Sequence, residues 1–356
     1  MRICSRKIRG LLNWLLVGLT ALASVTAHAQ WQQQTRNYMG TRVHVEVWSD
    51  DAVSATAGID AVMDEMDRIE KMMSPMIASS ALSLLNREGA ERAVAVPAEL
   101  FDVIQKSLVV SRLSDGAFDV TFASVGRYYD YREKKHPDAA TVAAALPAIN
   151  YRHLQLDAGA RTVRFMHPGV YVDLGGIAKG YAVDRGIALL RARGFKEMLV
   201  SAGGDTRLLG DRHGKPWVIG IKDPAGGERP VALLPLADVA VSTSGDYERF
   251  FDEDGVRYHH IIDPSTGDSA RAVRSVTIIG DDATWTDALS TTVFVLGPDK
   301  GLALVDRLGN VDAVLVDRDG ALRYSKSLQR LSAPTSDQTA IPAVPAQNAA
   351  SREAAN

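Results

Sequence analysis

The chain has 356 residues, a formal net charge of −3 and the composition of an ordinary globular protein. This length allows one large domain or two domains of ordinary size. The charge balance gives no reason to expect nucleic acid as a partner, because proteins that bind nucleic acid carry an excess of positive charge.

The first 29 residues predict a secretory signal peptide. Four basic residues precede a mostly apolar stretch over 11–25, and Ala27-His28-Ala29 has the small-x-small pattern of a cleavage site. The alternative is an uncleaved membrane anchor, but the stretch is shorter than the ~20 residues that a spanning helix needs. Removing the four positive charges takes the net charge from −3 to −7. We expect a periplasmic protein, with association with the inner membrane as the alternative.

The only cysteine, Cys4, lies within the predicted signal peptide. The mature chain would then have none, which excludes disulfides, a thiolate nucleophile and a cysteine-ligated metal. Export without disulfides is typical of a bacterial periplasmic protein that is large enough to build a stable core.

The apolar pattern after the signal peptide predicts a strand and then two helices. Residues 43–47 alternate between apolar and polar, as a half-buried strand does. Apolar residues between Ile59 and Met73 recur at helical spacing and predict an amphipathic helix over 52–73. A second helix is expected to start near Pro97, where a missing N–H group costs nothing.

The middle of the chain is rich in predicted strands. Residues 170–174 predict a short strand before a glycine pair, and a helix is expected over 177–193, ending at Gly194. Turn signals separate further short apolar runs, each expected to form a strand. These runs are 198–200, 217–221, 232–236, 239–241, 260–262 and 276–279.

The last third predicts helices, a hairpin and a tail. Helices are expected over 285–296 and 299–308, separated by Gly297-Pro298, and a hairpin over 311–324 turns at Asp319-Gly320. From residue 333 onward no apolar periodicity remains, which predicts a disordered tail. The pattern as a whole indicates an α+β fold with one domain over 30–332, because regular β–α–β alternation is missing.

The segment Val172-Asp-Leu-Gly-Gly-Ile-Ala-Lys-Gly180 joins a strand end, a glycine pair and a helix start. Glycines let backbone approach a bulky ligand, free N–H groups at a helix start attract phosphate, and Lys179 adds a positive charge. The spacing is neither a Walker A loop nor the dinucleotide-binding fingerprint. An ordinary strand–turn–helix with a solvated lysine explains it equally well.

Asp287 and Thr291 lie four residues apart on a predicted helix, so they share one face. A carboxylate and a hydroxyl suit a Mg²⁺ ion that is also bound by substrate phosphates. The alternative is a plain helix start, with Thr286 as the cap and Asp287 favourable at the helix dipole.

Three other motifs are weaker. His260 could act as a general base near neutral pH, or it could be a half-buried strand histidine. Phe118 could stack on a planar ring, although a core phenylalanine is commoner. Asp205 follows Ala202-Gly-Gly either as a placed carboxylate or as part of a plain turn.

Taken in chain order, these motifs resemble those of the FAD:protein FMN transferases, the ApbE family. The resemblance runs from about Tyr38 to Leu308. The matching motifs are Tyr38-Met-Gly-Thr41, Met73-Ser74 through Leu85-Asn86, Gly116-Ala-Phe-Asp119, the run 173–184, Gly203-Gly-Asp205, the run 242–247, His260-Ile-Ile-Asp-Pro264 and Asp287-Ala-Leu-Ser-Thr291.

The resemblance implies an α+β, T-fold-like architecture with the FAD site between the two halves of one large domain. The residues expected to line the FAD site are Met39, Met76, Ala117, Phe118, Asp119, Asp173, Lys179 and Ile261. The residues expected to bind Mg²⁺ are Asp287, Thr291 and Gly176, the last through its backbone carbonyl. Catalysis is expected from His260, Asp287 and Lys179. Met76 departs from the family, which often has a tyrosine there that packs on the flavin.

The implied reaction transfers FMN from FAD to a threonine or serine hydroxyl of an exported or membrane-bound flavoprotein and releases AMP. Lys179 would stabilise the developing charge. His260 is the candidate base, although phosphoryl transfer depends more on positioning and charge than on proton removal. Two alternatives stay open: a periplasmic FAD pyrophosphatase, which uses water and yields FMN and AMP, and a non-catalytic FAD-binding protein.

Overall fold

The computed structural model describes residues 29–227 and 229–332. The predicted C-terminal tail, and all of the predicted signal peptide except Ala29, lie outside these ranges.

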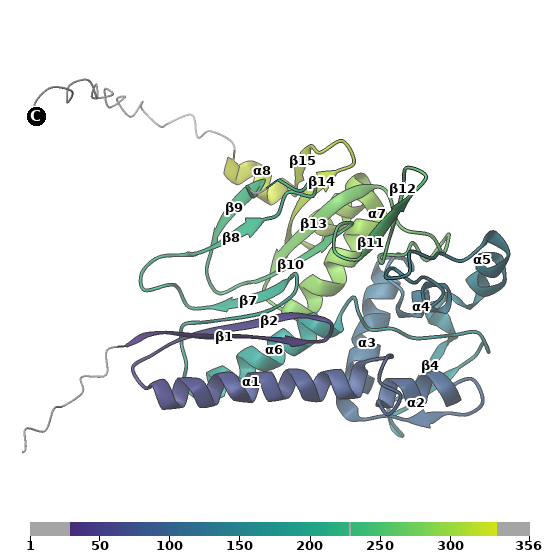
Figure 1. Ribbon diagram of the computed structural model, residues 1–356, viewed down its shortest axis with the longest axis horizontal. Coiled ribbons are helices and arrows are strands. Elements are labelled where there is room, and N and C mark those ends of the chain that lie inside the picture. Colours follow the sequence, from purple (N-terminus) through teal and green to yellow (C-terminus); the bar gives the residue numbers. More distant parts are fainter. Residues whose placement is uncertain (1–28, 228, 333–356) are drawn as a thin grey trace, which may run out of the picture.

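An eight-stranded sheet forms the centre of the molecule (Figure 1). In spatial order its strands are β1 (Gln30–Tyr38), β2 (Thr41–Ser49), β6 (Met198–Ala202), β7 (Asp205–Leu209), β10 (Ala240–Gly245), β13 (Val273–Gly280), β14 (Asp312–Asp317) and β15 (Leu322–Tyr324). All neighbouring strands pair antiparallel. The pairing of β2 with β6 brings together segments that are about 150 residues apart in the chain.

Three long helices pack against this sheet and against one another. They are α1 (Ala52–Met73), α6 (Ala178–Ala192) and α7 (Ala283–Leu308). Helix α1 contacts β1 and β2, α6 contacts β6 and β7, and α7 contacts β10 and β13. Because α6 also contacts both α1 and α7, it lies between them. Helix α7 is apolar enough to cross a membrane, but more than half of its most apolar stretch is buried, as in the core helix of a globular protein.

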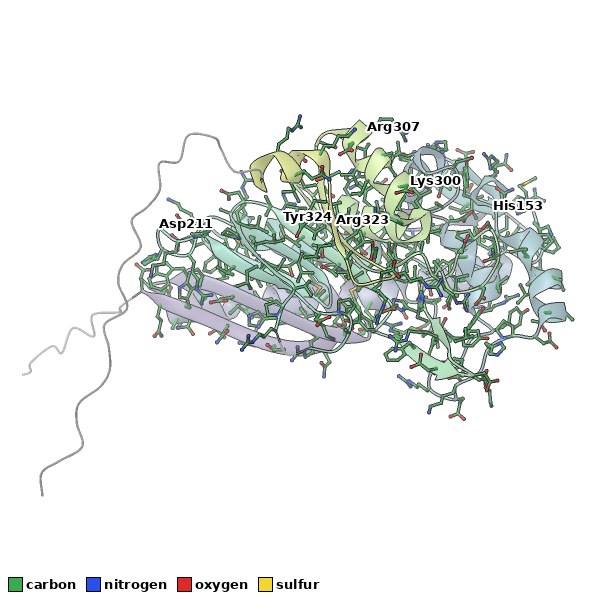
Figure 2. All side chains as sticks on the ribbon, turned by 90° about the horizontal axis from the view of Figure 1, so that it is seen from above. His153, Asp211, Lys300, Arg307, Arg323 and Tyr324 are labelled. Carbon is green, nitrogen blue, oxygen red and sulfur yellow. The ribbon has the colours of Figure 1, made fainter. Side chains whose placement is uncertain are left out.

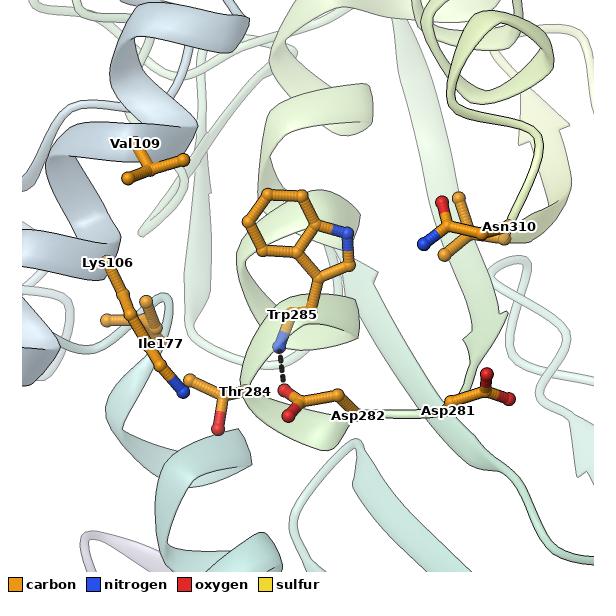
Figure 3. A pocket seen from close by; sticks show the side chains of 9 residues that line it. Lys106, Val109, Ile177, Asp281, Asp282, Thr284, Trp285 and Asn310 are labelled. Atoms are coloured by element: carbon orange, nitrogen blue, oxygen red, sulfur yellow. Dashed lines mark hydrogen bonds between the residues drawn. The ribbon is translucent and has the colours of Figure 1, made fainter.

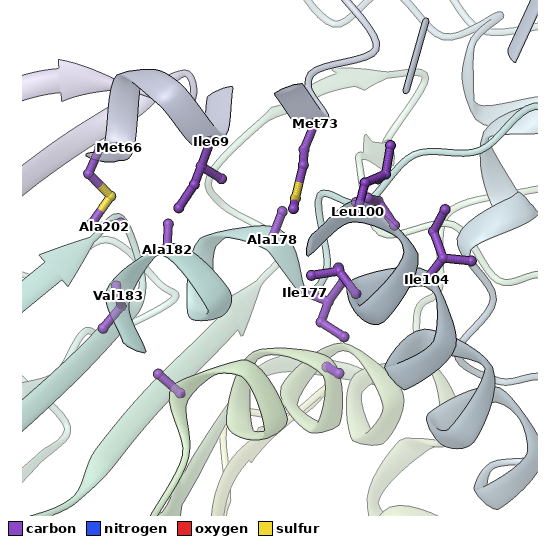
Figure 4. Packing of buried hydrophobic residues seen from close by; sticks show 14 of the residues in the cluster. Met66, Ile69, Met73, Leu100, Ile104, Ile177, Ala178, Ala182, Val183 and Ala202 are labelled. Atoms are coloured by element: carbon purple, nitrogen blue, oxygen red, sulfur yellow. The ribbon is translucent and has the colours of Figure 1, made fainter. Parts of the chain in front are cut away.

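The core is filled by the apolar faces of these elements. In α1 the buried side chains include all those whose spacing predicted the helix: Ile59, Val62, Met63, Met66, Ile69 and Met73. Figure 4 shows side chains of α1 meeting Ala178 and Ala182 of α6, with Leu100 and Ile104 of α3 (Ala98–Leu113) beside them. The small residues of α6 allow close packing of the neighbouring helices.

Residues 74–173 form a second half beside one end of the sheet (Figure 1). Besides α3, it contains α2 (Ala81–Glu88), α4 (Ala123–Gly126), α5 (Ala139–Ala145), three short 3-10 helices and a sheet of β3 (Val94–Ala95), β5 (Thr162–Phe165) and β4 (Leu154–Asp157). The remaining elements are the hairpins β8 (Trp217–Ile221) with β9 (Ala232–Leu236) and β11 (Phe250–Glu253) with β12 (Val256–His259), and helix α8 (Lys326–Ser332). In Figure 2, His153 of the second half and Asp211 of the β7–β8 connection lie toward opposite ends of the molecule.

Two tight turns lie side by side at the end of the sheet nearest the second half. Met39-Gly40 joins β1 to β2, and Gly203-Gly204 joins β6 to β7. The N–H group of Gly203 donates to the carbonyl oxygen of Arg42 at 3.0 Å, which ties the turns together. Met39, Gly40 and Gly203 have φ values of 53°, 70° and 64°, a region that glycine occupies without strain and methionine rarely enters.

The predicted strand at 170–174 is wrong. The segment is extended but belongs to no sheet, because side chains replace the neighbouring strand as hydrogen-bond partners. The side-chain amide of Asn86 bonds both the N–H and the carbonyl group of Val172, at 2.8 and 2.9 Å. The hydroxyl of Ser124 accepts from the N–H of Tyr171 at 3.0 Å.

The predicted strand at 260–262 is also wrong. Strand β12 ends at His259, so His260 follows a strand instead of lying within one. His260 still donates to the carbonyl oxygen of Arg249 at 3.2 Å, but the N–H of Ile261 bonds Nδ1 of His259, at 3.3 Å, instead of a neighbouring strand. Ile262 keeps a single bridge to Ser269.

The other predicted elements are confirmed, with small differences at their ends. Helix α1 has the predicted bounds, because Asp51 caps its start and the apolar periodicity ends at Met73. The predicted break at Gly297 is a local kink within α7, where this residue has φ 76° and ψ −179°.

Candidate active site

A cluster of charged residues forms where the start of α6, the start of β7 and the first turns of α7 meet. Lys179 comes from α6, Asp205 from β7, and Asp287 and Thr291 from α7. The two tight turns of the sheet border this cluster, because Asp205 directly follows Gly203-Gly204.

Lys179 lies at the centre of the cluster. Its Nζ is 2.9 Å from Asp205 Oδ2, 3.4 Å from Asp287 Oδ1 and 3.1 Å from the carbonyl oxygen of Gly175. An ammonium group has three N–H donors, so these three neighbours use its full capacity. Although burial lowers it, Asp205 and Asp287 raise the pKa of Lys179 above its ordinary value, and the side chain stays charged.

The two carboxylates are buried and share this one ammonium group. Asp205 and Asp287 are each 2% exposed. Burial, and then the charge of Asp205, raise the pKa of Asp287 to about 7, while Lys179 and the N–H group of Gly180 lower it. The N–H of Gly180 donates to Asp287 Oδ2 at 2.9 Å. The cluster therefore has one carboxylate more than it has positive charges, which favours a further cation.

Thr291 lies one turn beyond Asp287, as the spacing predicted, and its hydroxyl is 3.4 Å from Ser244 Oγ. Gly176 approaches the same hydroxyl. A Cβ atom at position 176 would lie 3.3 Å from Thr291 Oγ1 and 3.2 Å from Cε2 of Phe118. The structure thus brings together the three residues that were predicted to bind a metal.

Contacts made by Asp184 and Gly180, both on α6, fix the position of α6 relative to α7. The carboxylate of Asp184, on α6, accepts from the backbone N–H groups of Ala283 and Thr284 at 3.0 and 2.8 Å and caps the start of α7. Arg207 forms an ion pair with the same carboxylate. Gly180 allows the close approach of the helices, since a Cβ atom there would lie 2.1 Å from the carbonyl oxygen of Ala283.

His260 follows β12, and its N–H group donates to the carbonyl oxygen of Arg249 at 3.2 Å. Its Nδ1 is buried and has no hydrogen-bond partner in the part of the chain that the structure describes. Burial, and then the charge of Arg249, lower the pKa of His260 to about 3, so the ring is neutral. A neutral imidazole can accept a proton, but a pKa of about 3 makes it a weak base in the free protein.

The neighbouring His259 has a structural role. Its Nε2 donates to the carbonyl oxygen of Ala270 at 2.7 Å, and its Nδ1 accepts from the N–H of Ile261 at 3.3 Å. It is 2% exposed, and burial lowers its pKa to about 4. This neutral ring fixes the backbone that carries His260 and Ile261.

Two carboxylates predicted to bind FAD differ in their surroundings. Asp173 accepts from the N–H of Gly175 at 2.7 Å on the approach to α6, and burial raises its pKa. Asp119 is 6% exposed and accepts from the N–H and hydroxyl of Thr121 and from the N–H of Tyr151. Asp119 therefore holds the chain after α3 in place, a role that its motif did not predict.

The remaining predicted FAD contacts lie at different depths. Phe118 and Ile261 are buried, at 3% and 5% exposed, and Ala117 and Met39 are half-buried. Met76 lies in the connection between α1 and α2 and is 89% exposed. Packing of the flavin on Met76 stays a prediction.

Sequence reasoning left the role of Asp205 open and missed Arg249, a second charged residue beside the site. Asp205 carried a turn signal, but its partnership with Lys179 depends on how the β6–β7 hairpin lies against α6. Arg249 carried no motif signal at all. Its guanidinium lies against the first tight turn, since a Cβ atom at Gly40 would be 3.2 Å from Arg249 Nη2.

A separate pocket of about 330 Å³ lies between α3 and α7 (Figure 3). Trp285 lies at its centre, and its backbone N–H group donates to the capping carboxylate of Asp282 at 2.9 Å. The other residues that line it are Lys106, Val109, Ile177, Asp281, Thr284, Asn310 and Val311. None of the predicted site residues lines this pocket, so the cluster around Lys179 is the candidate active site.

The donors of the cluster fit Mg²⁺. Within 29–227 and 229–332, no three or more His, Asp or Glu side chains are grouped so that they could hold a metal ion by themselves. Mg²⁺ is usually bound through one or two carboxylates together with substrate phosphates and water. Asp287, the hydroxyl of Thr291 and the backbone of Gly176 provide oxygen donors of this kind, beside an excess of negative charge.

The fold and the cluster define an α+β enzyme with a buried, charged site at the ends of its central strands. Within this class the chain belongs to the ApbE family, whose sequence profile matches residues 39–315.

Individual relatives agree with this assignment. An FAD:protein FMN transferase of Treponema pallidum (strain Nichols) is 34% identical over 309 residues, which cover 82% of this chain and 85% of that protein. One of Vibrio cholerae is 30% identical over 327 residues, covering 88% and 97%. The crystal structure of the apbe protein of Thermotoga maritima is similar with a TM-score of 0.78 and 36% identity, over 85% of this chain and 99% of that chain. The predicted family and fold class are confirmed.

Proposed function

We propose that the chain transfers FMN from FAD to a hydroxyl group of a protein, in a reaction that requires Mg²⁺ and releases AMP. The observation that carries this proposal is the cluster in which Lys179, Asp205, Asp287 and Thr291 meet. It occurs in a chain whose similar relatives are named FAD:protein FMN transferases.

Asp287, Thr291 and the backbone of Gly176 would hold the metal. When bound there, Mg²⁺ would neutralise negative charge on the pyrophosphate and on the leaving AMP. Lys179 keeps Asp205 and Asp287 in position, because it bonds both of them. Helix α6 starts beside the cluster, and the N–H groups of a helix start attract phosphate.

The transfer itself exchanges a phosphoanhydride bond for a phosphate ester bond. The acceptor hydroxyl attacks the phosphorus on the FMN side of the pyrophosphate, and the bond from that phosphorus to the oxygen of AMP breaks. His260, neutral in the free protein, takes the hydroxyl proton. FMN is then joined to the acceptor as a phosphate ester, and AMP leaves with the bridging oxygen.

The acceptor and the compartment are part of the same proposal. We infer a threonine or serine on an exported or membrane-bound flavoprotein, and action in the periplasm. The support is the signal-peptide pattern of residues 1–29 and the lack of cysteine after Cys4.

One assay separates the transferase from its alternatives. Purified protein is mixed with FAD and Mg²⁺, with and without a flavoprotein acceptor, and AMP, free FMN and in-gel flavin fluorescence of the acceptor are measured. We expect AMP together with a fluorescent acceptor. AMP with free FMN and no labelled acceptor would show a pyrophosphatase instead. No AMP under either condition would leave only an FAD-binding protein.

A further inference from the structure

Arg249 carries a positive charge that no described residue pairs with. It lies in the connection between β10 and β11, and its side chain is exposed. Other arginines of this region are paired with carboxylates: Arg257 with Asp252, Arg271 with Asp268, and Arg274 with Asp246. In the part of the chain that the structure describes, the guanidinium of Arg249 has neither an ion-pair nor a hydrogen-bond partner.

The guanidinium lies among residues of the candidate site. A Cβ atom at Gly40, in the turn beside Met39, would be 3.2 Å from Arg249 Nη2. The carbonyl oxygen of Arg249 accepts from the N–H of His260 at 3.2 Å. Its charge also acts on both Asp173 and His260, lowering the pKa of each. Arg249 is therefore close to the candidate base, His260, and to Asp173 in the segment that precedes α6.

Lys179 is poorly placed for the role that was predicted for it. Its three N–H donors are already directed at Asp205, Asp287 and the carbonyl oxygen of Gly175. A pyrophosphate brings two negative charges, and its oxygens need donors that are not already used. A guanidinium has five N–H donors in a planar fork that matches phosphate geometry.

We propose that Arg249 binds the pyrophosphate of FAD, with its guanidinium N–H groups donating to phosphate oxygens, while Lys179 holds the two buried carboxylates. The ligand class is a dinucleotide with a pyrophosphate bridge, and its identity as FAD rests on the proposed function. Because the donors of Arg249 have no protein partner, they are available without breaking an existing ion pair. Part of the FAD affinity would then come from the charge of Arg249. Replacing this residue should therefore reduce the effect of salt concentration on FAD affinity.

The test compares two arginines of one region. The dissociation constants of FAD and of ADP are measured by fluorescence quenching and calorimetry at several salt concentrations, without divalent metal. The proteins are the wild type, Arg249→Gln, Arg249→Lys and the control Arg257→Gln. The control removes the same charge from the adjoining hairpin, but from a guanidinium that is already paired with Asp252 and Asp246. Thermal melts verify that each variant is folded.

We expect Arg249→Gln to weaken the binding of FAD and ADP about tenfold or more, since hydrogen bonds to charged groups are the strong ones. The same substitution should also reduce the effect of salt concentration on the dissociation constants. Arg249→Lys should restore part of the affinity, and Arg257→Gln should stay within about twofold of the wild type. Unchanged affinity in Arg249→Gln, or an equal loss in Arg257→Gln, would overturn the assignment.

The proposed function can fail separately. A wild-type protein that binds FAD but releases no AMP with Mg²⁺ would refute the transferase, while the comparison of variants would still decide the role of Arg249. A wild-type protein that binds neither FAD nor ADP would refute both proposals.

Discussion

The buried charges of the site support the proposed binding of a divalent cation. Asp205 and Asp287 are both 2% exposed and share the ammonium of Lys179. Burying a second carboxylate without a second positive charge is costly, and the raised pKa of Asp287 expresses that cost. In the proposed function, a divalent cation bound beside Asp287 would offset this cost.

Asp287→Asn should nearly abolish turnover and leave FAD binding largely intact. The amide oxygen can still accept from the N–H of Gly180, so the contact between the helices survives. The charge that favours the metal is lost, and we expect turnover to fall about 100-fold or more. The measurements are AMP release with Mg²⁺ and FAD affinity without it. Asp281→Asn, an exposed change just before α7, is the control. Turnover near the wild-type rate would show that the metal assignment is wrong.

His260 should titrate far below the usual range of histidine in the free protein. Burial and the charge of Arg249 hold its pKa at about 3. The negative charge of bound FAD beside Arg249 should raise that pKa, which would make the ring a better base in the complex. NMR titration of isotope-labelled histidine, with and without FAD, measures both values, and His260→Gln identifies the signal. A free-protein pKa near 6.5 would contradict the expectation.

At the scale of elements, the site depends on the register of α6 and α7. Asp184 caps α7 from α6, and Gly180 lets the helices touch at Ala283. The spacing of Asp287 and Thr291 could be predicted from sequence, because it follows from helix geometry alone. The contact between Lys179 and Asp205 could not, since it depends on how separate elements pack.

Gly180→Ala should disturb this register. The added Cβ atom would lie 2.1 Å from the carbonyl oxygen of Ala283 and 2.7 Å from the Cβ atom of Asp287, so the helices must move apart. We expect a loss of roughly 1–3 kcal/mol in the free energy of unfolding and a marked loss of turnover. Chemical denaturation and AMP release measure the two effects. Gly159→Ala, where the nearest atom would be 3.4 Å away, should change neither. A Gly180→Ala protein as stable and active as the wild type would show that the contact is unimportant.

The two wrong strand predictions have one physical cause. Apolar runs at 170–174 and 260–262 look like strands in sequence, but side chains take some of the backbone hydrogen bonds that a neighbouring strand would have taken. Asn86 does so at Val172, and His259 does so at Ile261. Such partners are distant in sequence or depend on a ring orientation, so local patterning cannot reveal them. The long helix α1 was predicted correctly because its apolar periodicity is local.

At the scale of the molecule, the structural histidine His259 joins the end of the β11–β12 hairpin to helix α7. His259 is neutral, buried and bonded on both ring nitrogens, and it lies edge-on to Phe294 of α7 at 5.5 Å between ring centroids. Protonation would place an N–H of the ring against the N–H of Ile261. The fold therefore requires the neutral form.

Acid should destabilise the protein through His259. Its pKa is about 4 in the folded state and about 6.5 when unfolded, so the unfolded state binds more protons between these values. The free energy of unfolding should fall as the pH drops through this window, by up to about 1.4 kcal/mol per pH unit from this one group. Urea titrations from pH 7 to pH 4 measure it. His259→Gln should be less stable at pH 7 but lose less on acidification. An equal loss in both proteins would assign the effect to other groups.

The position of the two tight turns has a consequence for how the protein can be altered. Met39-Gly40 and Gly203-Gly204 join their strands with two residues each, beside the charged cluster. An added residue there would shift one strand against the next and turn its side chains to the opposite face. The opposite end of β7 leads into the exposed connection around Asp211, toward the far end of the molecule from His153 (Figure 2). Insertions, tags or fused domains are best placed at that connection, where the chain can lengthen without moving the site.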